Sequence, residues 1–138
     1  MGIAAIDVVI DTAITGGGPT QTITGALGGL TPKAVAIYAT RCVTTGTVIN
    51  GAMLSVGFTD GTNQFCNSWA ADHGIANGAS ADTARRFDSA KLVQVMTTEC
   101  SAAAIDGEAS FSSFGANTVT INWSTLPTTA VKLVVVFF

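Results

Sequence analysis

A histidine beside an aspartate is the first place in this sequence where chemistry could occur. His73 is the only histidine of the chain, and it follows Asp72. An imidazole can act as a general base when it is oriented and a nucleophile lies within reach. Serine hydrolases of the common type hold that nucleophile in a GxSxG turn, and no serine here has such neighbours. We therefore expect His73 to be a solvated loop residue and the protein not to be an enzyme.

Metal and phosphate sites are equally hard to assemble from the sequence. Asp60-Gly61-Thr62-Asn63 shares residue types with a calcium loop, but no acidic residue follows at the closing position, so we expect a hairpin turn. The segment Gly25 to Gly29 does not reproduce GxGxxG. Cys42, Cys66 and Cys100 are odd in number and lack the paired spacing of zinc sites. We expect three reduced thiols, no metal and no cofactor.

Two tryptophans and a pair of arginines are the remaining candidates for binding. Trp123 alternates with apolar residues and is expected in the core, which leaves Trp69 as a possible sugar-stacking residue. Arg85 and Arg86 lie near acidic residues, so they could recognise an acidic partner or form a solvated ion-pair network. The expected partner-contact segment is built around the residues Trp69, Asp72, His73, Asn77, Arg85 and Arg86.

The charge of the chain limits its partners. Only 11% of the residues are charged, against about 25% in typical soluble domains. Six basic residues and a net charge of −3 leave no basic stripe, so nucleic acid is not an expected partner. A small domain with so few charges must cover its surface with Ala, Thr, Gly and Ser, which suits association with other protein surfaces.

Neither a membrane span nor a secretion signal is expected. The longest apolar stretch, Val131 to Phe138, is interrupted by Lys132 and is far shorter than the roughly 20 residues that cross a bilayer. The N-terminal segment has no basic leader, and Asp7 and Asp11 interrupt its apolar part. We expect synthesis and retention in a cytoplasm.

The first half of the chain has the period of two residues that is typical of strands. Ile6, Val8 and Ile10 alternate with the residues between them, and short strands are expected around Gln21 to Thr24 and over Ala34 to Val43. The clearest apolar face of a predicted strand comes next along the chain and is formed by Val48, Ala52, Leu54, Val56 and Phe58. A hairpin turn at Asp60-Gly61 and a strand that carries Phe65 and Trp69 are expected to follow it.

The middle of the chain is less regular. Between Ala70 and Phe87 the pattern dissolves into small and polar residues, which predicts the longest loop, with a helical turn near Asp82 to Arg86 as an alternative. Ala90 to Glu99 favours a strand, and a helix stays open there because both faces are apolar.

The last third predicts a hairpin and an interior strand. Apolar residues alternate on both sides of a turn at Gly115 to Asn117. Ala130 to Phe138 is apolar on both faces, as expected for a strand in mid-sheet or one that a neighbouring subunit covers. Together these elements predict one all-β domain over residues 1–138, a two-sheet antiparallel β-sandwich, jelly-roll-like or immunoglobulin-like in size, with about eight or nine strands.

Four segments resemble a family of small β-sandwich proteins and domains encoded by tailed bacteriophages. They cover about a quarter of the chain and are Thr31 to Tyr38, Leu54 to Asp60, Phe111 to Trp123 and Lys132 to Phe138. The resemblance implies a virion structural protein in a tail, in a fibre or on a capsid, assembled in the host cytoplasm. It implies no catalytic residue.

The expected function is therefore capsid decoration, in which the protein stabilises a shell through protein contacts. A tail or fibre component is one alternative. A module that binds host-surface carbohydrate through Trp69 is the other. The expected partners are further copies of the chain, preferably as a trimer, and other virion proteins such as the major capsid protein.

Overall fold

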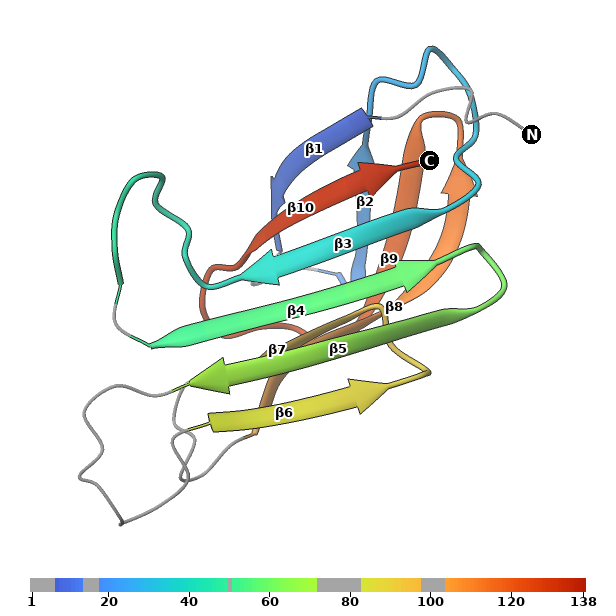
Figure 1. The fold of residues 1–138 in the computed structure, drawn as a ribbon. Helices are drawn as coiled ribbons and strands as arrows, with labels where there is room; N and C mark the ends of the chain where they lie inside the picture. The colour runs from blue at the N-terminus through green and yellow to red at the C-terminus, as the bar shows by residue number, and fades with distance from the viewer. Residues whose placement is uncertain (1–6, 14–17, 50, 72–82, 98–103) are drawn as a thin grey trace, which may run out of the picture.

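The computed structural model describes residues 7–13, 18–49, 51–71, 83–97 and 104–138, and these form ten strands in two antiparallel sheets (Figure 1). The six-stranded sheet has the order β1-β10-β3-β4-β5-β6, and its strands are β1 (Asp7–Thr12), β10 (Lys132–Phe137), β3 (Val35–Thr40), β4 (Ala52–Thr59), β5 (Gln64–Ala71) and β6 (Thr83–Asp88). The four-stranded sheet has the order β2-β9-β8-β7, and its strands are β2 (Thr20–Thr24), β9 (Thr118–Thr125), β8 (Ile105–Gly115) and β7 (Val93–Met96).

The predicted all-β, two-sheet antiparallel sandwich is confirmed, with ten strands in place of eight or nine. A jelly-roll arrangement is not confirmed. Strands β3 to β6 follow one another as neighbours in one sheet, and strands β7 to β9 do so in the other. The chain therefore forms two meanders, and β1, β2 and β10 complete the sheets.

Strand β10 lies in the middle of the six-stranded sheet, as its two apolar faces predicted. It pairs with β1 on one side and with β3 on the other. Leu133, Val135 and Phe137 are fully buried against the four-stranded sheet. Trp123 is buried in the same core, and its indole N–H donates to the Gln21 side chain at 3.0 Å. Its predicted core position is confirmed.

The two sheets come into close backbone contact where β4 passes the residue before β7. A Cβ built on Gly57 would lie 1.7 Å from the carbonyl oxygen of Leu92, a separation that no side chain can tolerate. Ser55, two residues earlier on the same side, is buried, and its hydroxyl accepts a hydrogen bond from the backbone amide of Gln94 at 3.2 Å. Small residues on this side of β4 therefore set the distance between the sheets.

Several sequence expectations need correction. Residues 83–88 form the edge strand β6, so the predicted loop to Phe87 and the alternative of a helical turn near Arg86 are both wrong there. Pairing with β5 stabilises a segment whose own pattern is weak. Residues 93–96 are strand, which excludes the helical alternative for them. Val48 lies outside β4, in the connection from β3, and is 94% exposed.

Candidate functional site: the outer face of the six-stranded sheet

Strand β4 of the six-stranded sheet turns a row of large apolar side chains away from the core. On β4 the outward residues are Leu54, Val56 and Phe58, whereas Ser55 and Gly57 point inward. The alternation that the sequence predicted for this strand is correct. Because β7 needs the inner side for its close approach, the bulky residues must occupy the other side.

Strand β1 follows the same rule. Val8 and Ile10 are 56% and 69% exposed, while Val9 packs against the core. Asp7 and Asp11 share the inner side with Val9, and both are only partly exposed. The Asp7 carboxylate accepts the Ala26 amide at 2.5 Å, and that of Asp11 accepts from Gln21 at 3.2 Å. Both carboxylates of β1 are therefore hydrogen-bonded on the inner side of the sheet. The apolar side chains of Val8 and Ile10 point the other way, into solvent.

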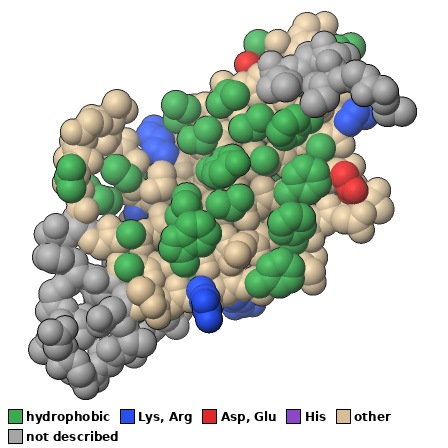
Figure 2. Space-filling view, viewed as in Figure 1, with side chains coloured by type: hydrophobic (Ala, Val, Ile, Leu, Met, Phe, Trp, Pro, Cys, Tyr) green, Lys and Arg blue, Asp and Glu red, His purple; other side chains and the backbone are tan. Residues whose placement is uncertain are grey.

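The strand registers arrange the outward side chains in three rows across the sheet, which together we call the outer face. The first row is Val8, Val136, Ala36, Phe58 and Phe65. The second row is Ile10, Val134, Tyr38, Val56, Asn67 and Phe87. The third row is Thr12, Lys132, Thr40, Leu54, Trp69 and Arg85. Figure 2 shows how hydrophobic side chains dominate this face.

Apart from Tyr38 on β3, the aromatic residues of the outer face gather over β4, β5 and β6. The rings of Phe58 and Phe65 are 5.9 Å apart between centroids, and those of Phe65 and Phe87 are 6.3 Å apart and stacked. Both distances lie in the favourable range for aromatic pairs. The aliphatic residues lie over β1 and β10. The outer face therefore has an aromatic half and an aliphatic half.

Trp69 and Arg85 are cross-strand partners at one end of the aromatic half. Trp69 is 40% exposed, and it lines an open groove of about 440 Å³ together with residues of the 41–49 connection, among them Cys42 and Val48. Exposed edges of an indole beside a groove can stack against a flat apolar surface, including a sugar ring.

The outer face of the four-stranded sheet has the opposite character. Its outward positions on β2 and β9 carry hydroxyl and amide side chains. The hydroxyls of Thr22 and Thr120 are 3.1 Å apart across the two strands, and Thr20 donates to the Asn122 side chain at 3.3 Å. The hydroxyl and amide groups of this surface can form hydrogen bonds with water, whereas most side chains of the outer face cannot.

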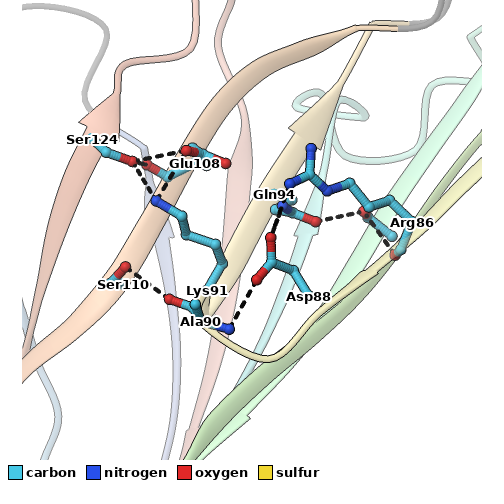
Figure 3. A network of polar contacts seen from close by, with 9 residues as sticks. Arg86, Asp88, Ala90, Lys91, Gln94, Glu108, Ser110 and Ser124 are labelled. Carbon is cyan, nitrogen blue, oxygen red and sulfur yellow. Dashed lines mark hydrogen bonds and ion pairs between the residues drawn. The ribbon is translucent and has the colours of Figure 1, made fainter.

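A polar network joins the β6 edge to the four-stranded sheet (Figure 3). The buried Gln94 side chain donates to Asp88 at 3.1 Å and accepts from Ser68 at 3.4 Å. Arg86 forms an ion pair with Asp88 at 3.0 Å. The Ala90 amide donates to the Asp88 carboxylate at 2.8 Å and, as the largest cause, lowers its pKa. The network fixes the edge strand and offers no free nucleophile.

The neighbouring half of this network is an ion pair between Lys91 and Glu108 at 2.9 Å. Burial raises the pKa of Glu108, but hydrogen bonds from Lys91 and Ser124 lower it by more, so the net shift is downward. Glu108 is therefore ionised and paired. A general acid would require the reverse shift.

A third ion pair joins the segment that follows β3 to strand β8. The Arg41 guanidinium lies 2.6 Å from the Asp106 carboxylate, and both side chains are largely buried. Arg41 also donates to the Met96 carbonyl at 3.2 Å and to Thr129, while Asp106 accepts from the Thr128 amide and hydroxyl. A largely buried pair that is held by several further hydrogen bonds is typical of a structural role.

The predicted partner-contact residues separate in the structure. Trp69 and Arg85 lie side by side on the outer face, whereas Arg86 lies on the other side of β6 in the polar network, as the ion-pair alternative for it predicted. Asp72, His73 and Asn77 lie outside the described residues. Sequence reasoning missed the role of Val8, Ile10, Phe65 and Phe87. For Val8, Ile10 and Phe65 the signal was an apolar side of a strand opposite small or polar residues, which we had not predicted to face solvent, whereas the pattern of β6 gave no such signal for Phe87.

The described residues include two cysteines and several carboxylates, whose arrangement can be compared with metal and thiol sites. No three metal-ligating side chains gather there. Asp60 is the hairpin turn residue that was predicted, accepting the Thr62 and Asn63 amides, of which the Asn63 bond contributes most to lowering its pKa. Cys42 and Cys66 are free, and burial raises the pKa of Cys66 to about 12.

The described part of the chain has no helix with the length and hydrophobicity that a bilayer crossing requires. Comparison of the chain with protein families, with curated proteins and with solved structures finds no match.

Proposed function

We propose that this protein is a structural component of a bacteriophage particle that works by packing its outer face against protein. The observation that carries the proposal is the apolar outer face itself. Monomeric soluble proteins rarely expose a continuous apolar patch of more than a few hundred Å². Ile10, Tyr38 and Phe87 are all exposed on this face and belong to one row of it.

The proposed place of the protein is the capsid, as a decoration protein that is assembled in the host cytoplasm. The resemblance of its strands to small phage β-sandwich proteins supports this choice, and a tail or fibre position is the alternative. A rigid two-sheet sandwich suits either place, because shell and tail components carry load through packed surfaces and not through chemistry.

Cosedimentation tests the proposal. The protein should sediment with empty capsids of the phage that encodes it, and Ile10→Glu should abolish this, because burying a charge in an apolar interface is costly. Leu30→Glu is the matched control, since Leu30 is 50% exposed but belongs to none of the three rows. Sedimentation with isolated tails alone would favour the alternative. No binding to either would contradict the proposal.

A glycan-binding function is the second candidate, and the exposed Trp69 beside its groove favours it. A glycan array would then detect binding that Trp69→Ala removes. Phe65→Ala is a matched control, because Phe65 lies on the same strand and the same face and is equally exposed. Binding that survives Trp69→Ala would reject this site.

A further inference from the structure

We infer that a second copy of this chain covers the outer face, in a face-to-face pair whose two-fold axis runs parallel to the strands between β3 and β4. The inference rests on the proposed function, in which the outer face packs against protein, and it names that protein as a second copy of the chain. Two such sheets would pack at about 10 Å with their strands nearly aligned.

The area of the outer face agrees with a stable pair. Four aromatic side chains on it are each 40% exposed or more: Tyr38, Phe65, Trp69 and Phe87. Covering them removes roughly 400 Å² from water, given that an aromatic side chain presents 150–250 Å². Val8, Ile10 and the half-buried aliphatic residues bring the total to on the order of 800 Å², which is what each partner of a standard interface contributes.

The distribution of side-chain sizes selects the axis. Rotation about an axis along the strands places β1 over β6, β10 over β5 and β3 over β4 of the other copy. The aliphatic half then meets the aromatic half, with Ile10 opposite Phe87 and Val136 opposite Phe65. Large residues facing small ones interdigitate well. An axis across the strands would instead stack each strand on its own copy, and Phe87 would face Phe87.

The charges of the outer face are compatible with this pairing. Its only charged residues among those described are Lys132 and Arg85, both in the third row at one end. Lys132 then lies opposite Trp69 of the other copy, where an ammonium group is attracted to the indole ring. The first two rows contain no charge, so the pair buries none in its centre.

The oligomeric state is the first test. Light scattering coupled to size exclusion should give a dimer for the protein itself, and Ile10→Glu or Phe87→Glu should weaken association at least about 100-fold. Leu30→Glu, at an exposed residue outside the strands, should remain dimeric. The substitutions at Ile10 and Phe87 lie on opposite edge strands, so that if one variant fails to fold the other still tests the interface. A monomer, a trimer, or a dimer that both variants leave intact would overturn the inference.

Cross-linking tests the axis. In a background of Cys42→Ser and Cys100→Ser, Ile10→Cys and Phe87→Cys chains would be mixed and treated with a thiol reagent about 10 Å long. The strand-parallel axis predicts cross-linking only in the mixture. Cross-linking of either variant with itself would overturn this geometry.

The same protein separates this inference from the proposed function. If the protein is a monomer in solution and binds capsids through the outer face, the inferred dimer is wrong and the proposed function stands. A dimer of the stated geometry that binds neither capsids nor tails would end the function and leave the inference.

Discussion

The outer faces of the two sheets are built from the same alternating strand pattern and yet differ in chemistry. The four-stranded sheet presents exposed threonine side chains that are paired across strands, such as Thr22 with Thr120, whose hydroxyls hydrogen-bond to each other. The six-stranded sheet presents Ile10, Val134 and Tyr38 in one register row. Hydrophobic residues in strands are therefore not all core residues here. Because one outer surface of the sandwich is polar and the other apolar, the apolar surface is the favoured side for assembly.

The largest effect is expected from removing β10, which contributes to the core and to the outer face together. A chain ending at Thr129 loses the strand that separates β1 from β3 and the fully buried Leu133, Val135 and Phe137. We expect it not to fold. Circular dichroism and thermal melting check this, and a soluble product with a cooperative transition would contradict it.

A large loss of stability is expected from Gly57→Ala, because the inner side of β4 has no room. The new methyl group would overlap the Leu92 carbonyl, and forced backbone movement should cost about 3 kcal/mol. Gly18→Ala is the control, since no atom lies within 4 Å of its built Cβ. Urea unfolding measures both variants. Equal stability of the two would refute the close approach of the sheets.

Exchanging the character of the two exteriors tests the comparison directly. Ile10→Thr with Val134→Thr changes one cross-strand pair on the outer face, and Thr22→Val with Thr120→Val makes the reverse change on the other sheet. Each should alter the free energy of unfolding by about 1 kcal/mol or less. Only the first should weaken self-association, and the second should lower solubility. The opposite result, measured by light scattering, would show that the polar exterior is the interface.

A smaller effect concerns pH. The folded-state pKa values of Asp88 and Glu108 are lowered from their ordinary 3.8 and 4.5, so their contribution to stability is complete above those values and is lost as the pH falls below them. Because both pairs are partly exposed, we expect about 1 kcal/mol or less in total. Glu108→Gln should flatten the decline in melting temperature at acidic pH. An unchanged profile would contradict the assignment.

The smallest effect is on thiol reactivity. Cys42 is exposed, whereas burial raises the pKa of Cys66 to about 12, so a thiol reagent should modify Cys42 quickly and Cys66 only on unfolding. Titration of the unfolded, unreduced chain should find three thiols. Recovery of one would reveal a disulfide and refute the expectation that all three cysteines are reduced.

Local patterns in the sequence were sufficient for most of the fold. The period of two residues located the strands, Asp60-Gly61 and Gly115 to Asn117 located two hairpin turns, and the doubly apolar β10 required an interior position. Of the candidate contact residues, Trp69 and Arg85 could be named from their types. That they would be neighbours could not, because their pairing depends on β6, which the sequence pattern did not reveal.

What the sequence determined by itself is the alternation of side chains on each strand, since that follows from backbone geometry. It did not determine which of two faces points into the core. That choice was made by the tertiary structure at Gly57, where the Leu92 backbone needs the space that a side chain would occupy. The side carrying Leu54, Val56 and Phe58 was thereby turned outward, and a clear apolar alternation became part of the partly exposed outer face.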